Sequence, residues 1–134
     1  MTYARVGPDG RDLPHPGFGY VDIYSTSGVL ERRFVSNGQL NAPWGVAKAP
    51  AGFFGEDGMT GVVLIGNFGD GRINAFDSDG RFLGQLRKSG QPIVIEGLWA
   101  ITFAPASSPI NPNWLYFAAG PDDEEEGLFG YITK

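Results

Sequence analysis

The sequence predicts an all-β fold built from β-propeller blades, and an internal repeat is the main observation behind this prediction. Residues 19–30 return in similar form as residues 71–82, and residues 43–50 return as residues 98–105. Two separate blocks that recur in the same order indicate a repeat architecture. The 21 glycines and 10 prolines fit many short strands joined by tight turns.

Short alternating or continuous apolar segments, bounded by glycine, proline, asparagine or aspartate, predict the strands. The predicted strands span residues 20–24, 30–35, 45–49, 62–67, 72–76, 82–87, 100–104, 114–119 and 128–133. No segment shows a helical period over a useful length. Antiparallel strands in units of about 50 residues are typical of propeller blades. A plain β-sandwich is the alternative.

The order of these strands predicts about two to two-and-a-half four-stranded antiparallel blades. Residues 1–18 are expected to form an irregular N-terminal arm, followed by a partial blade over 19–42. A complete blade is expected over 43–90 and a second partial blade over 91–134. Incomplete blades leave apolar faces and strand edges uncovered, which favours association of copies into a ring or an open array.

Composition excludes several classes of function. The chain has no cysteine, which excludes a disulfide framework and a thiol nucleophile. Its net charge is −5 and its acids concentrate in the run 122–126, with no basic patch, so we expect no nucleic-acid partner. No apolar stretch reaches the length of a membrane span, and no apolar signal segment begins the chain.

Four blocks of sequence resemble an uncharacterised family of exported bacterial proteins, the PEP-CTERM-associated, NHL-repeat-like propellers. The blocks are residues 41–45, 66–76, 96–100 and 115–121. The resemblance is to the C-terminal part of that family. It implies a propeller fold and an extracellular or cell-surface location, but no known activity. From the sequence to residue 134 we expect no sorting tail of the kind found in that family.

Candidate ligand-binding residues lie at predicted turns and strand starts. Asn67 and Asp70 are expected near the rim of a central cavity, where their oxygens suit a cation, although both are also good turn formers. Trp44 and Trp99 open equivalent strands and suit stacking on a sugar or another flat ligand. Packing between blades is the favoured role for both tryptophans.

The acidic run is the other candidate site. Asp122, Asp123 and Glu124, together with Asp70, form a candidate site for a divalent cation such as calcium, and a solvated loop is the favoured alternative. The segment 77–80 resembles the start of a calcium loop but lacks its closing glutamate, which favours a hairpin turn. No residue pattern predicts a catalytic group.

These observations predict a non-catalytic, self-associating propeller module without a cofactor, with a structural or binding role, expected outside the cytoplasm. The alternative is a metal-dependent enzyme of the lactonase or lyase kind acting on a sugar derivative. In that case Asn67, Asp70 and the acidic run would hold the cation, and a metal-bound water would be the nucleophile.

Overall fold

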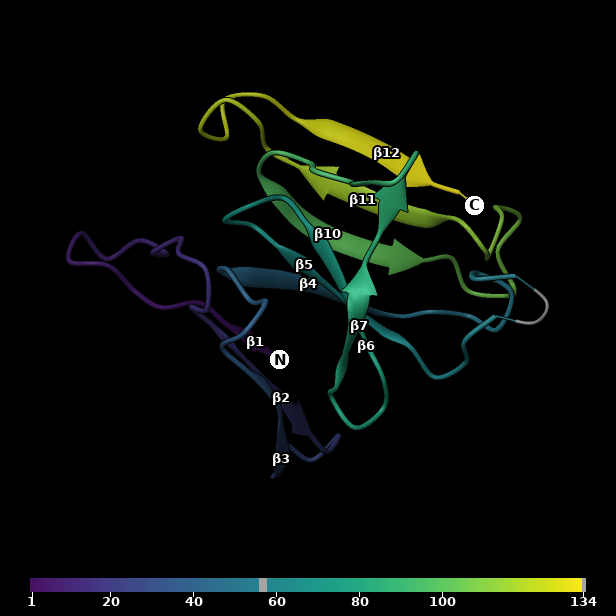
Figure 1. The fold of residues 1–134 in the computed structure, drawn as a ribbon, viewed down its shortest axis with the longest axis horizontal. Coiled ribbons are helices and arrows are strands. Elements are labelled where there is room, and N and C mark those ends of the chain that lie inside the picture. The colour runs from purple at the N-terminus through teal and green to yellow at the C-terminus, as the bar shows by residue number, and fades with distance from the viewer. Residues whose placement is uncertain (56–57, 134) are drawn as a thin grey trace.

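The computed structural model describes residues 1–55 and 58–133, and this part of the chain folds into strands and turns without a helix (Figure 1). The first sheet contains β1 (Thr2–Tyr3), β2 (Tyr20–Tyr24) and β3 (Leu30–Ser36). The second contains β4 (Pro43–Lys48), β5 (Val63–Asn67), β6 (Ile73–Phe76) and β7 (Phe82–Gln85). The third contains β10 (Leu98–Phe103), β11 (Leu115–Ala119) and β12 (Leu128–Ile132), and β8 (Arg87–Lys88) pairs with β9 (Gln91–Pro92).

Every pair of neighbouring strands is antiparallel, and strands follow one another in chain order within each sheet. The predicted all-β class is therefore confirmed, and all nine predicted strands are present within about two residues of their expected bounds. The described residues do not close a ring of sheets, so the propeller class stays a prediction.

The strand β1 was not predicted, and it lies inside the expected irregular arm. Thr2 pairs with Val21 and Tyr3 pairs with Tyr20, so β1 stands beside β2 as β5 stands beside β6. The rest of residues 1–18 forms turns and two isolated bridges, Val6 with Asp12 and Phe18 with Asn41. The first sheet therefore repeats three of the four strand positions of the second.

The core consists of two apolar clusters, one at each boundary between successive sheets. Val21, Phe34 and Leu40 pack with Ile65 and Phe76 between the first and second sheets. The larger cluster lies between the second and third sheets; its buried members include Leu64, Ile73, Leu98, Ile101 and Leu115. Each strand alternates its side chains between two faces, so β5 and β6 contribute to both clusters.

A close approach of backbones joins the second and third sheets. Gly45 on β4 is buried, and a Cβ placed there would lie 2.8 Å from the Ile101 nitrogen and 2.9 Å from the Trp99 carbonyl oxygen. Only a residue without a side chain allows β10 to pass this near. Gly66 on β5 likewise leaves room for Leu98, whose Cδ2 would lie 3.0 Å from an added Cβ.

The turn between β6 and β7 is the hairpin turn expected for the segment 77–80. The Gly80 N–H donates to the Asp77 carbonyl, and Gly80 has a φ of 85°, which glycine adopts easily. The Asp77 carboxylate accepts the backbone N–H groups of Arg81 and Asp79, each at 2.9 Å. The Arg81 bond is the largest cause that holds the pKa of the Asp77 carboxyl below its ordinary value of 3.8.

We predict that Gly45→Ala lowers the free energy of unfolding by about 1–3 kcal/mol, because the new methyl group overlaps the β10 backbone. Urea unfolding followed by circular dichroism measures the change. Gly127→Ala is the matched control, because nothing lies within 4 Å of a Cβ at Gly127. Equal effects of the two substitutions would contradict the role given to Gly45.

We predict that Asp77→Ala destabilises the protein at pH 7 and that this effect shrinks in acid. A carboxyl whose pKa is lower in the folded state stabilises the fold above about pH 3.8, and this contribution is lost as the pH falls through the folded-state pKa. Urea unfolding at pH 7 and at pH 3 measures the difference. Asp79→Ala is the control, because Asp79 contributes its backbone N–H to the turn and the substitution keeps that group. A pH-independent loss in Asp77→Ala would contradict the account.

Candidate functional site

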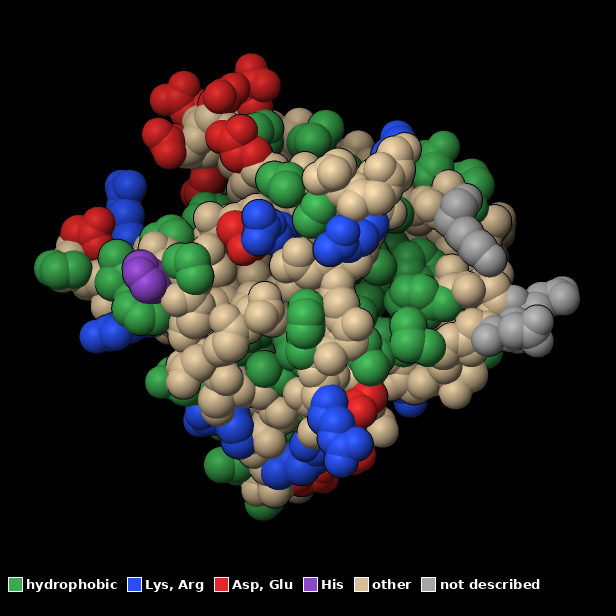
Figure 2. Space-filling view, in the orientation of Figure 1, with side chains coloured by type: hydrophobic (Ala, Val, Ile, Leu, Met, Phe, Trp, Pro, Cys, Tyr) green, Lys and Arg blue, Asp and Glu red, His purple; other side chains and the backbone are tan. Residues whose placement is uncertain are grey.

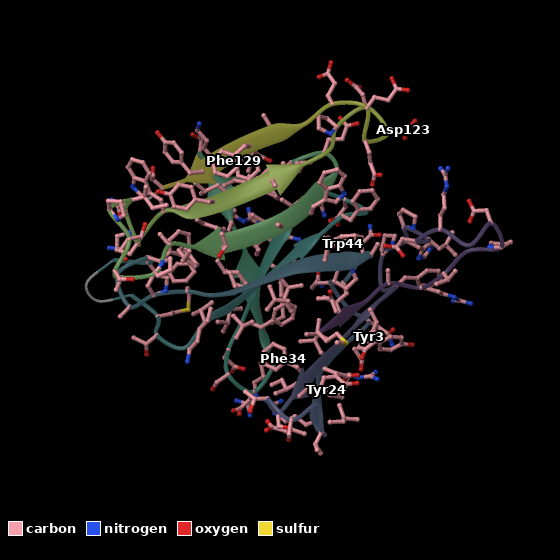
Figure 3. The ribbon with its side chains drawn as sticks, turned by 180° about the vertical axis from the view of Figure 1, so that it is seen from behind. Tyr3, Tyr24, Phe34, Trp44, Asp123 and Phe129 are labelled. Carbon is pink, nitrogen blue, oxygen red and sulfur yellow. The ribbon has the colours of Figure 1, made fainter. Side chains whose placement is uncertain are left out.

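The connections β1–β2, β5–β6 and β11–β12 leave their sheets at the same end, because the strands of each sheet run in the same alternating order. Together they form a cleft of about 600 Å³. Its lining residues are Gly10, Arg11, Asp12, Trp44, Phe68, Asp123 and Glu124. In Figure 3, Trp44 lies between the N-terminal arm and the loop that carries Asp123.

Trp44 forms the aromatic wall of the cleft, and half of its surface (51%) is exposed. It lies on the alternating face of β4 that points away from Gly45 and the core. Its indole N–H donates to Asp12 Oδ2 at 2.9 Å, and its ring lies 6.4 Å from the ring of Phe68. Packing between blades was the favoured role for Trp44, but half of its surface is exposed. The ring is therefore accessible to a ligand in the cleft.

Trp99, the equivalent residue of the third sheet, is partly buried and does not line the cleft. Its indole N–H donates to Glu124 Oε1 at 3.2 Å, and its ring covers Gly120, where an added Cβ would lie 2.7 Å from Trp99 Cζ2. Both tryptophans thus bind a carboxylate of a connecting loop through the indole nitrogen. Trp99 fixes the acidic loop, whereas Trp44 faces the open cleft.

Asn67 and Asp70 occupy two different environments. Asn67 is fully buried, and its Nδ2 donates to the Gln39 carbonyl at 2.8 Å, which also accepts from Asn74 Nδ2 at 3.1 Å. Asp70 Oδ1 accepts the Arg72 N–H at 3.2 Å, as in an Asx turn. These bonds give both residues a structural part in the turn and its support. Their proposed part in ligand binding stays a prediction, and neither lines the cleft.

The acidic run forms the exposed turn between β11 and β12 and stands out as a cluster of acidic side chains in Figure 2. Asp122, Asp123 and Glu124 have φ values of 53°, 52° and 71°, which non-glycine residues rarely adopt. The Asp122 N–H faces Glu96 Oε1 at 3.4 Å. Within residues 1–55 and 58–133, no three histidine or acidic side chains gather to hold a metal ion. The cation site predicted for Asp70 and this run stays a prediction.

The sequence analysis missed four of the residues that line the cleft: Gly10, Arg11, Asp12 and Phe68. The first three lie in the segment expected to be an irregular arm, and Phe68 lies in a turn between two strands. The only sequence signal was the placement of polar residues beside glycine in both turns.

None of the described residues belongs to a helix long and apolar enough to cross a membrane.

Comparison with known proteins finds similarity to three uncharacterised proteins of Acanthamoeba polyphaga mimivirus. One is 41% identical over 138 residues, which cover 100% of this chain and 32% of the viral protein. The second is 42% identical over 124 residues, covering 91% and 31%, and the third is 39% identical over 107 residues, covering 78% and 20%. The chain thus spans a third or less of the length of these curated relatives. No protein-family model matches the chain.

These comparisons correct the resemblance to an exported bacterial PEP-CTERM-associated family, which was wrong. The relatives are viral proteins, and no family model supports the bacterial assignment. The four blocks on which the resemblance depended, residues 41–45, 66–76, 96–100 and 115–121, correspond to strands, strand starts and tight turns. Such sequences recur wherever short antiparallel strands repeat, so they identify the local structure better than the ancestry. The expected cell-surface location depended on that resemblance and loses its support.

Proposed function

We propose that this chain is a non-catalytic, self-associating segment of a β-propeller, in which each of the three sheets is one blade. Copies associate head to tail, with the outer face of β10–β12 of one copy against the outer face of β1–β3 of the next. The observation that carries the proposal is an exposed aromatic face on the third sheet. This face occupies the same register positions that are buried in the second sheet.

Phe129 and Ile73 show this equivalence most clearly. Ile73 pairs with Gly66 across β5 and β6, and Phe129 pairs with Ala118 across β11 and β12. Ile73 is fully buried against the third sheet, whereas Phe129 is 73% exposed. The position is apolar in both sheets but covered in only one. This difference supports a further sheet as the missing cover for Phe129.

Two more positions on the same face follow this pattern. Tyr131 corresponds in register to Ala75, which is 4% exposed, while Tyr131 is 53% exposed. Ala100 corresponds to Gly45 and is exposed, although Gly45 lies buried under β10. A small residue at Ala100 leaves room for the inner strand of another sheet to approach.

The aromatic side chains of this face are already ordered against one another. The rings of Trp114 and Tyr131 stack with centroids 4.3 Å apart, and Tyr116 and Phe129 lie nearly parallel at 6.2 Å. Rigid aromatic groups lose little conformational entropy on binding and are enriched in protein interfaces. An exposed cluster of this kind is typical of an association surface.

The outer face of the first sheet is the proposed counterpart. Tyr20 and Tyr24 lie on the side of β2 opposite to the buried Val21, and the Tyr24 hydroxyl bonds that of Tyr3 at 2.8 Å. The Arg33 guanidinium lies 4.5 Å from the centre of the Tyr20 ring and pairs with Asp22. In Figure 3, Tyr24 and Phe129 lie toward opposite ends of the molecule, as a head-to-tail contact requires. Such contacts produce a ring where the rotation closes and an open array where it does not.

We predict that the chain self-associates in a concentration-dependent manner and that Phe129→Lys shifts it to the monomer. Placing a charge in the centre of an apolar interface adds a desolvation cost and removes aromatic contacts. Size-exclusion chromatography with light scattering, over about a hundredfold range of protein concentration, measures the molar mass.

Val29→Lys is the matched control, because Val29 is 62% exposed at the tip of the β2–β3 hairpin and outside both proposed faces. It should associate as the unchanged protein does. A folded protein that stays monomeric at every concentration would refute the proposal, and so would a Phe129→Lys variant with unchanged association.

A further inference from the structure

We infer that the cleft between the arm and the acidic turn binds a small organic cation with an alkylammonium group. This site is separate from the proposed association faces, because it lies at the end of the sheets where the connections gather. Its residues come from three connections and from the start of strand β4. The inference depends on the aromatic wall of the cleft and on the charge of its lining.

The aromatic wall is fixed in place by bonds that leave its surface free. The indole N–H of Trp44 is already bound by Asp12, so the group that Trp44 offers to a ligand is its ring. The Phe68 N–H donates to the Ala42 carbonyl at 2.9 Å, and Ala42 lies two residues before Trp44. The same backbone segment thus sets the positions of both rings. A preorganised pair of rings at the edge of a cleft suits a cation, which is attracted to the ring faces.

The charge of the lining favours a cation over a neutral or anionic ligand. The lining carries three carboxylates, from Asp12, Asp123 and Glu124, against the single guanidinium of Arg11. Asp12 binds Trp44 through Oδ2, and no hydrogen bond from another described residue reaches its Oδ1. The rest of the acidic run, Asp122, Glu125 and Glu126, belongs to the same turn as the lining residues and makes the local potential more negative.

Size supports a ligand of modest dimensions. A cleft of about 600 Å³ lies within the range of small-molecule sites and exceeds the need of a bare metal ion. A neutral sugar would also stack on Trp44 and donate its hydroxyl groups to the carboxylates, but it carries no charge for their negative potential to attract. The dependence of binding on ligand charge and on salt therefore separates these two ligand classes.

The test compares choline with 3,3-dimethylbutan-1-ol, which has the same shape without the charge. Binding is followed by tryptophan fluorescence and by ligand-observed NMR, at low salt and at about 0.5 M salt. We expect choline to bind at least about fivefold more tightly than the neutral alcohol, and to lose affinity severalfold at high salt. Nα-acetyl-lysine amide and spermidine, tested in parallel, show whether the preferred alkylammonium belongs to a lysine side chain or to a free amine.

Variants of the cleft locate the binding. Trp44→Leu should weaken choline binding about fivefold or more, and Asp123→Asn about threefold. Glu125→Gln is the matched control, because Glu125 lies in the same acidic turn but does not line the cleft, and we expect no more than a small change. Circular dichroism verifies the fold of each variant. Asp123 is exposed, so its variant keeps the test valid if Trp44→Leu does not fold.

Three outcomes would overturn the inference. The first is equal affinity for choline and for its neutral isostere. The second is binding of a neutral sugar such as glucose with no detectable binding of any of the three cations. The third is cation binding that responds to Glu125→Gln as strongly as to Asp123→Asn, because that would place the cation on the exposed acidic turn. Loss of self-association in Phe129→Lys should leave choline binding unchanged.

Discussion

The close approach of β4 and β10 is the constraint on which the rest of the structure depends. A sheet of three or four strands with about five residues each cannot bury a core by itself and needs a neighbouring sheet. Gly45 lets the backbone of β10 come near enough for Ile101 to contact the second sheet. Because Gly45 has no side chain, the two sheets come together and Leu98 and Ile73 belong to one continuous apolar cluster. The order of the three sheets follows from this contact and from the packing of Phe34 against Ile65 and Phe76 between the first and second sheets.

The same stacking produces both the proposed association faces and the cleft. The second sheet contributes to both apolar clusters, whereas the first and third sheets each contribute to one, so each end of the stack leaves one face uncovered. Because the strands of all three sheets alternate in the same order, the connections β1–β2, β5–β6 and β11–β12 lie at the same end of the stack. The exposed Phe129 and the exposed Trp44 therefore have a common geometric origin, although they serve different proposed roles.

Much of the fold could be predicted from sequence because it is encoded locally. Alternation and turn residues identified nine strands, but β1 has only two residues and shows no period to detect. The exposure of Trp44 depends on which face of β4 packs against β10, and the alternation of residues in β4 alone does not determine this. Asn67 looked like a turn residue, yet its burial depends on the carbonyl of Gln39 from a distant connection. The cleft combines three connections that have no common period, so no local pattern predicts it.

Two buried amide side chains hold the connection between the first and second sheets in place. Asn67 and Asn74 both donate to the Gln39 carbonyl, and Gln85 Nε2 donates to Asn74 Oδ1 at 3.0 Å. Buried polar groups are costly unless they are bonded, so these bonds to the Gln39 carbonyl stabilise the observed placement of the connection 37–42. Among the described residues, the buried Oδ1 atoms of Asn41 and Asn67 have no hydrogen-bond partner. That connection also accepts the N–H groups of Phe68 and Gly69 through its own carbonyls. The segment that these amides bind therefore also holds Phe68 beside Trp44. The packing of the first sheet on the second is thus connected to the aromatic wall of the proposed ligand site.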